Sequence, residues 1–145
     1  MKRFGILVAL ALMMGLSFTS CGSDDDNSNN IGSVVGKWNF ESVKYTVNGA
    51  SETEVYDDNE PGCAKDYLEF FENGSAVSGD YVEDCELLQD PATYTRSGNT
   101  LTIDADGFIS TPEVVIANGT TLVLRYVETD EDGVVEITDI TLLKD

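Results

Sequence analysis

The sequence has no histidine and few basic residues. Its 145 residues include 8 Lys and Arg against 27 Asp and Glu, which gives a formal net charge of −19. The absence of histidine excludes a His-centred catalytic triad and a His-ligated metal site. Eight basic residues cannot form the extended cationic face that nucleic-acid binding requires, so we expect no nucleic-acid partner. The hydrophobic fraction of 41% is enough for the core of one domain.

Residues 1–20 have the features of a secretory signal. Lys2 and Arg3 precede a 15-residue apolar run from Phe4 to Phe18, and small polar residues follow it. The run is shorter than the roughly 20 apolar residues that a membrane-spanning helix needs. We therefore expect residues 1–20 to be a signal peptide rather than a membrane span.

The residues around Cys21 indicate the type of signal. Thr19-Ser20-Cys21-Gly22 resembles the lipobox of bacterial lipoproteins, with Phe18 at the position where leucine is usual. The resemblance implies that the Cys21 thiol receives a diacylglyceryl group, that the signal is cleaved before it, and that the new amine is acylated. Each buried CH₂ of an acyl chain contributes about 0.8 kcal/mol to membrane attachment. We therefore expect lipid attachment at Cys21 and a membrane partner reached through its acyl chains.

Residues 21–33 are expected to form a tether between Cys21 and the folded domain. The segment is polar and of low complexity, and it offers no side chains for a core. Within it, Ser23-Asp24-Asp25-Asp26 resembles the acidic export signal of Bacteroidota surface lipoproteins. That resemblance implies a lipid-anchored protein exposed on the outer membrane, whereas the alternative interpretation of these residues is a solvated spacer.

Residues 34–145 have the pattern of one all-β domain. Apolar and polar residues alternate in short runs rich in Val, Ile, Thr, Tyr and Phe, and no segment keeps a helical apolar period. Dipeptides such as Asn48-Gly49 and Asn118-Gly119 separate the runs, because Asn and Gly tolerate the positive φ of tight hairpins. The predicted strands span residues 35–47, 51–56, 66–72, 75–82, 92–97, 100–104, 111–117, 120–129 and 133–143.

The first and last predicted strands change phase partway. Apolar positions shift from even to odd after Phe40 and from odd to even after Ile137, which predicts β-bulges near Glu41-Ser42 and near Thr138-Asp139. Short hairpin connections and two long, bent terminal strands favour a small antiparallel up-and-down (meander) β-barrel of about eight strands, whose first and last strands pair. The alternative is a β-sandwich, which long crossing loops would favour.

Several segments resemble lipocalins. Val35-Gly36-Lys37-Trp38 resembles the G-x-W opening of that family. The order of 66–70, 93–103 and 120–124 resembles the lipocalin-like domain of Bacteroidota lipoproteins. The resemblance covers nearly all of residues 34–145 and implies a barrel that binds a small hydrophobic or amphipathic ligand. Because a small barrel can be filled by its own side chains, whether it has an open cavity stays undecided at this point.

Cys63 and Cys85 are the two cysteines that remain besides Cys21. An even pair in an oxidising compartment is typical of a structural disulfide. We therefore expect a Cys63–Cys85 bond that closes a loop of roughly twenty residues around the third and fourth predicted strands. The spacing is not C-x-x-C, so we do not expect a redox-active pair.

Inward aromatic residues are the candidate ligand-binding set, since rings and phenol hydroxyls suit an amphipathic ligand. The alternative function is a surface module with a filled barrel, which recognises a glycan or a protein through its loops or through outer aromatics such as Tyr67 and Phe71. The acidic clusters lie in predicted loops, and 130–133 fits a hairpin turn better than a calcium loop. We therefore expect no catalytic residue, metal or cofactor. The candidate ligand-binding residues are Trp38, Phe40, Tyr45, Phe70, Tyr94 and Tyr126.

Overall fold

The structure, a computed structural model, describes residues 31–145. The expected signal peptide, the expected lipid-attachment residue Cys21, the segment Ser23–Asp26 and most of the expected tether lie outside the described residues. Residues 31–145 are all-β, and they include no helix with the length and hydropathy that crossing a membrane requires. The strands are β1 (Gly36–Val47), β2 (Ala50–Val55), β3 (Tyr67–Phe70), β4 (Ser75–Val82), β5 (Glu86–Ser97), β6 (Thr100–Ala105), β7 (Phe108–Ser110), β8 (Glu113–Ala117), β9 (Thr121–Thr129) and β10 (Val135–Lys144).

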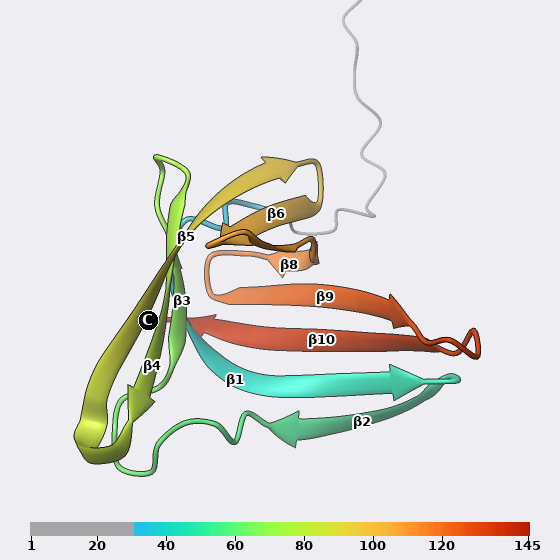
Figure 1. The fold of residues 1–145 in the computed structure, drawn as a ribbon, viewed down its shortest axis with the longest axis horizontal. Coiled ribbons are helices and arrows are strands. Elements are labelled where there is room, and N and C mark those ends of the chain that lie inside the picture. The colour runs from blue at the N-terminus through green and yellow to red at the C-terminus, as the bar shows by residue number, and fades with distance from the viewer. Residues whose placement is uncertain (1–30) are drawn as a thin grey trace, which may run out of the picture.

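The strands form a closed antiparallel barrel (Figure 1). Starting from β1, each strand pairs with the next in the order β3, β4, β5, β6, β8, β9 and β10, and β10 pairs with β1 again. Eight strands therefore close the barrel, while β2 adds to β1 and β7 adds to β6. The pairing of the first and last strands confirms the predicted up-and-down barrel, and the β-sandwich alternative is wrong.

β1 has two neighbours along one edge, and this divides the sheet. Its first part, from Gly36 to Asn39, pairs with β3, whereas the part from Ser42 to Val47 pairs with β2. Beyond this point the sheet separates into one wing of β9, β10, β1 and β2 and a second wing of β3, β4 and β5 (Figure 1). We call the end where β1 meets β3 the closed end, and the end at the β1–β2, β4–β5 and β9–β10 hairpins the open end.

The hydrophobic core fills the closed end. Trp38 is 1% exposed, and its Nε1 donates a 2.6 Å hydrogen bond to the Val34 carbonyl. Large apolar side chains from five other strands pack around it, and each stabilises the fold by about 25 cal/mol per Å² of apolar surface removed from water. The largest of these fully buried side chains are Phe70, Leu101, Val114, Leu122, Leu124 and Leu142.

One predicted bulge is present and the other is not. The register of β1 against β10 shifts between Phe40 and Ser42, which confirms the bulge near Glu41-Ser42. β10 keeps a single register with β9 from Val135 to Leu143, so the bulge predicted near Thr138-Asp139 is wrong. Ile137 instead lies on the outer face, directly opposite Val127 of β9. The change of phase in the sequence thus reflects a partly apolar outer face, and not an inserted residue.

One strand is much longer than predicted, and another was not predicted. β5 begins at Glu86 rather than at residue 92, and β7 was not predicted. Pro91 lies inside β5 and normally argues against a strand interior, because it lacks a backbone N–H. It is tolerated here because β5 pairs with β6 only from Thr93 onward, which leaves the edge of β5 at Pro91 without a partner in the sheet.

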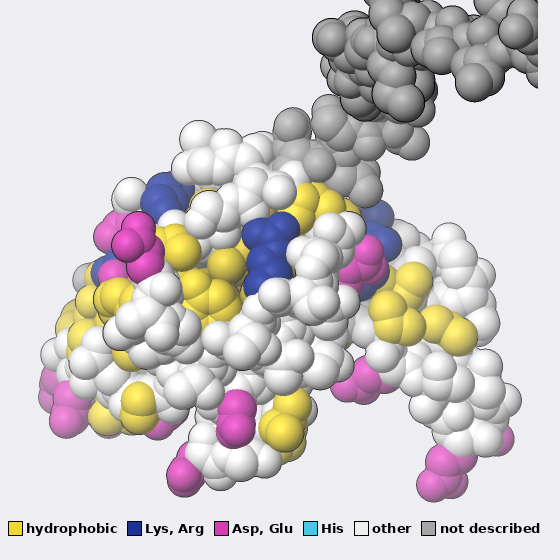
Figure 2. Space-filling model, turned by 90° about the horizontal axis from the view of Figure 1, so that it is seen from above, with side chains coloured by type: hydrophobic (Ala, Val, Ile, Leu, Met, Phe, Trp, Pro, Cys, Tyr) yellow, Lys and Arg dark blue, Asp and Glu magenta, His cyan; other side chains and the backbone are white. Residues whose placement is uncertain are grey.

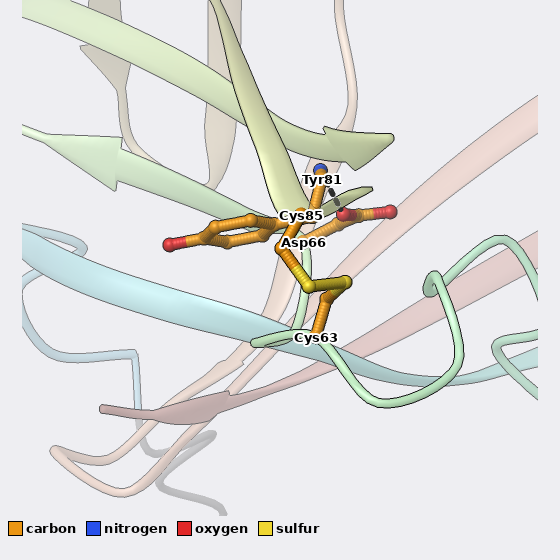
Figure 3. Close-up of a disulfide and its surroundings, with 4 residues drawn as sticks. All are labelled: Cys63, Asp66, Tyr81 and Cys85. Atoms are coloured by element: carbon orange, nitrogen blue, oxygen red, sulfur yellow. Dashed lines mark hydrogen bonds between the residues drawn. A yellow bond between two sulfur atoms is a disulfide. The ribbon is translucent and has the colours of Figure 1, made fainter. Parts of the chain in front are cut away.

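A disulfide fastens the connection from β2 to the second wing. Cys63 and Cys85 are bonded with their Cα atoms 5.3 Å apart, which confirms the predicted pairing (Figure 3). Nearby, the carboxylate of Asp66, which is 3% exposed, accepts a 2.7 Å hydrogen bond from the backbone N–H of Tyr81 (Figure 3). The segment that precedes β3 is therefore held against the far end of β4 by one covalent bond and one hydrogen bond.

Candidate functional site

The barrel contains an apolar cavity just above the closed-end core. Its volume is about 180 Å³, below the 300–1,000 Å³ typical of sites for drug-sized ligands. A water molecule takes up about 30 Å³ of liquid, so the cavity has the size of roughly six waters. It therefore suits a small ligand, or the apolar part of a larger one. The lining residues are Leu68, Phe70, Ala76, Val77, Ser78, Asp90, Ala92, Ile103, Ala105, Ser110 and Tyr126.

The cavity exists because the inner face of β4 to β7 carries small side chains. Successive residues of a strand point to opposite faces, so every second residue of β4 and β5 faces inward. Ala76 faces Ala92 across this pair, and neither side chain reaches the middle of the barrel. One level lower, Leu101 and Leu122 are fully buried and fill the same cross-section. The change from leucine to alanine along the barrel axis thus sets the floor of the cavity.

Four polar side chains line the cavity, those of Ser78, Asp90, Ser110 and Tyr126. Burial raises the pKa of Tyr126, and the neighbouring Ser110 side chain opposes this shift in part. Asp90 is the charged residue of the lining, and no hydrogen bond or ion pair of its carboxylate occurs within residues 31–145. The site can therefore offer a neutral phenol and an unpaired carboxylate to a bound molecule.

The cavity wall is incomplete between β5 and β6. Because these strands pair only between Thr93 and Ser97 of β5, the first half of β5 diverges from β6. Two open hollows of about 370 and 520 Å³ lie in this gap, and they share Asp90, Ala92 and Ala105 with the cavity lining. The cavity therefore adjoins the β5–β6 gap at the side of the barrel.

Two of the predicted ligand-binding residues, Phe70 and Tyr126, line this cavity. Trp38 lies lower, in the closed-end core. Tyr94 packs edge-on against Phe70 with ring centroids 4.9 Å apart, and its hydroxyl donates a 2.9 Å hydrogen bond to the Phe71 carbonyl. Trp38 and Tyr94 thus support the floor and one wall rather than face the open space.

Phe40 and Tyr45, the remaining predicted residues, lie along β1. Phe40 stacks on Tyr56 with ring centroids 4.6 Å apart, so it belongs to the wall that the β2–β3 connection covers. Tyr45 is 47% exposed near the open end. All six predicted residues thus lie on the inner faces of their strands. Their role in ligand binding stays a prediction.

The sequence reasoning favoured aromatic residues and missed the small ones. The space is created by Ala92, Ala105 and Ser110, which were not singled out. Only Ala92 lies within a predicted strand, whereas Ala105 and Ser110 fall between the predicted strands 100–104 and 111–117. Their size carried the signal for a cavity, but it becomes readable only when the register between strands is known.

The platform of outer aromatics considered as an alternative, Tyr67 with Phe71, is not formed. Tyr67 lies on the outer face of β3, but it is only 4% exposed. Its ring covers Gly79 of β4, and Lys37 lies over it with Nζ 4.0 Å from the ring centroid. Its hydroxyl accepts a 2.7 Å hydrogen bond from the Gln89 side chain. Only Phe71 of the proposed pair is exposed, so the alternative of a paired aromatic surface on β3 is wrong.

Carboxylates dominate the surface around the open end. In the face shown in Figure 2, Asp and Glu side chains lie mainly toward the lower and outer margins, and Lys and Arg side chains lie in the upper and central part. Burial and, after it, the charges of Asp58, Asp66, Asp80 and Asp57 raise the pKa of Tyr56 to about 12. Burial, followed by repulsion from Asp66, Asp90 and Asp58, also raises the pKa of Asp80. The interior near the open end is thus a region of negative potential.

The acidic residues of the described strands and loops lie apart from one another or in turns. Within residues 31–145, no group of three or more His, Cys, Asp or Glu is arranged to hold a metal ion. The segment after β9 is a hairpin turn, in which the Asp130 carboxylate accepts hydrogen bonds from the backbone N–H groups of Asp132 and Val134. This bonding within the turn agrees with the hairpin interpretation of residues 130–133.

Comparisons with known proteins agree with this geometry. A family model described as a lipocalin-like domain matches residues 34–124, more than half of the chain. A lipocalin-like protein from Bacteroides uniformis has a TM-score of 0.56 and 18% identity, over 79% of this chain and 100% of that one. A protein from Bacteroides eggerthii has a TM-score of 0.53 and 14% identity, over 77% of this chain and 98% of that one.

A solved structure from an animal is also similar to this chain. Lobster apocrustacyanin A1 has a TM-score of 0.50 and 14% identity, over 84% of this chain and 64% of that one. No curated protein matches the chain. Sequence identities this low show a common fold and nothing further about the ligand.

Proposed function

This chain belongs to the lipocalin-like domain family, whose members are typically binding proteins and not enzymes, and from this we propose that it binds a small hydrophobic or amphipathic ligand inside the barrel. The observation that carries the proposal is the cavity of about 180 Å³ between Phe70, Ile103 and Tyr126. Its walls are mostly apolar, and the Tyr126 hydroxyl can orient a polar group, as in ligand sites generally. No enzymatic activity is part of the proposal.

Exposed apolar side chains at the open end support an amphipathic ligand that extends out of the cavity. Among residues 31–145, only two large apolar side chains that are exposed, Phe71 and Leu143, lie at the closed end. The others lie toward the open end. By pairing register, Tyr45, Val47, Leu88 and Phe108 among them face inward, where exposed apolar side chains can contact a ligand. The remaining ones lie on outer faces, and they are Val55, Leu87, Ile109, Val127 and Val135.

The test is binding of the neutral fluorescent probe N-phenyl-1-naphthylamine to residues 31–145. This segment contains the closed sheet, its core and the disulfide, so we expect it to fold without the residues that precede it. Ala92→Leu places a larger side chain in the cavity and should abolish the fluorescence increase. Thr95→Leu, on the outer face of the same strand, is the matched control and should bind as the parent does. Probe binding that survives Ala92→Leu unchanged would contradict the proposal.

We also propose that the protein is anchored to the outer membrane through lipid on Cys21 and is exposed at the cell surface. The support is the lipobox-like Thr19–Gly22, the preceding apolar run and the acidic Ser23–Asp26. Mass spectrometry of the N-terminal peptide should find a diacylglyceryl group and an acyl group on Cys21. Cys21→Ser should release the protein from the membrane fraction. An unmodified Cys21 in membrane-bound protein would refute the anchor.

The export segment has a separate test. Replacing Asp24, Asp25 and Asp26 together with Ala should leave acylation intact but remove access of an external protease to the protein on whole cells. The matched control replaces three acidic residues of the domain, Asp57, Asp58 and Glu60, with Ala. This variant should leave protease access unchanged. Equal protease access for both triple variants would contradict a sorting role for residues 24–26.

A further inference from the structure

On the inner face of the barrel strands, acidic residues lie in the open half and basic residues lie at the closed end. In the strands of the open half, pairing register and alternation place Glu52 and Glu54 of β2, Asp80 of β4 and Asp90 of β5 inward. Glu128 and Glu136 face each other on the same side of the β9–β10 pair. Like charges directly across a strand pair are destabilising, so nothing in the packing of the fold favours this arrangement.

Basic residues of the described strands are absent from that half of the inner face. Lys144 and Arg96 face inward only at the closed end, where Lys144 lies over the Trp38 ring and Arg96 donates to the Gly32 and Gly98 carbonyls. On the outer face, Arg125 is bound to both carboxylate oxygens of Asp139 at 2.7 and 2.9 Å. The negative charge inside the open half therefore has no internal counterion among the strands of residues 31–145.

Asp90 connects this field to the apolar cavity. It lines the cavity and one of the hollows in the β5–β6 gap, so its carboxylate faces both the apolar space and solvent. Asp80 is its diagonal neighbour across β4–β5, since Asp90 pairs with Ser78. Diagonal neighbours lie about 7–8 Å apart, a distance at which two carboxylates can share one small cation. Because Asp90 is exposed, an ammonium there would keep part of its hydration and avoid the desolvation cost of a buried ion pair.

We propose that the barrel selects cationic amphiphiles: the apolar group occupies the cavity between Phe70, Ile103 and Tyr126, and a protonated amine lies at Asp90. This inference rests on the proposed function and names the ligand class for the same cavity. An anionic amphiphile, such as a fatty acid, would meet uncompensated repulsion from Asp90 and Asp80. A neutral ligand gains the apolar contacts alone, and the order of affinity is therefore amine, alcohol, carboxylate.

Three eight-carbon ligands with different head groups test the selection of cationic amphiphiles. Octylamine, octanol and octanoate are titrated against N-phenyl-1-naphthylamine bound to residues 31–145 at pH 7 and low salt. Octylamine should displace the probe at a concentration about tenfold lower than octanol, and octanoate should be the weakest. Asp90→Asn should remove most of the amine preference without changing octanol. Glu69→Gln removes a charge of the same sign from the outer face of β3, next to the lining residues Leu68 and Phe70, and should preserve the preference.

The outcomes separate the two proposals. Equal displacement by octylamine and octanol, or an amine preference that Asp90→Asn leaves unchanged, overturns the selection while the cavity remains a binding site. If Glu69→Gln removes the amine preference to the same extent as Asp90→Asn, the preference reflects the net charge of the protein. That result overturns the role of Asp90. If the naphthylamine probe itself fails to bind the parent protein, the proposed function fails and the selection fails with it.

Discussion

At the scale of single residues, small side chains shape both faces of the barrel wall. Inside, Ala76 and Ala92 leave the space that becomes the cavity. Outside, Gly79 leaves the space that the Tyr67 ring occupies, so that this tyrosine is buried on the outer face. The small size of these residues is thus a requirement of the structure, because a close-packed protein has few voids that could absorb an added methyl group.

Gly79→Ala should destabilise the protein by about 1–3 kcal/mol, as overpacking usually does. A Cβ at this position would fall within the contact radius of the Tyr67 ring, and the ring is held by Gln89 and Lys37. Urea unfolding measures the change. In a Tyr67→Ala background the same substitution should cost much less, and a cost equal in both backgrounds would show that the ring is not the obstacle.

Asp80→Asn should stabilise the protein at neutral pH, by on the order of 0.5 kcal/mol, the scale of a like-charge contact across strands. The pKa of Asp80 is raised in the folded state by burial and by Asp66, Asp90 and Asp58. The folded state therefore binds the Asp80 proton more tightly than the unfolded chain, and the penalty of ionisation is present above the folded pKa. Thermal unfolding should show the gain of the variant shrinking as the pH falls through that pKa. A gain that is constant with pH would contradict the account.

At the scale of elements, the barrel is held by strand closure at one end and by a covalent link near the other. β1 and β10 close the sheet along nearly their whole length. In the second wing, β3 pairs with β1 only at the closed end, so no strand closes the sheet on that side at the open end. The Cys63–Cys85 bond instead ties the turn after β4 to the segment that leads into β3. The disulfide therefore compensates for missing strand pairs at the open end.

The double variant Cys63→Ala, Cys85→Ala should lose about 3 kcal/mol of stability, because the bond closes a loop of 22 residues in the unfolded chain. Urea unfolding of the variant and of the parent gives the difference. The control is the parent treated with reductant, which should shift to the same midpoint. A change below about 0.5 kcal/mol would show that the link does not constrain the chain.

At the scale of the whole molecule, the sequence predicted the architecture well and the site in part. Alternation and Asn-Gly turns were sufficient for the barrel, since turn chemistry such as the positive φ of Asn48 and Gly49 is local. The Thr138-Asp139 bulge was wrong because an apolar outer face gives the same pattern as a shift of phase. The β5–β6 gap depends on where two consecutive strands stop pairing, and the cavity depends on which strand faces meet inside the barrel, and neither is encoded by a local pattern.

The most direct test of the central claim is NMR of residues 31–145 during titration with octanol, with side-chain signals assigned. The account predicts saturable shifts of the Leu68 and Ile103 methyl groups and of the Tyr126 ring, which line the cavity. Leu143, exposed at the closed end, should not move. Shifts confined to exposed side chains such as Val55, with the cavity residues unchanged, would contradict binding inside the barrel.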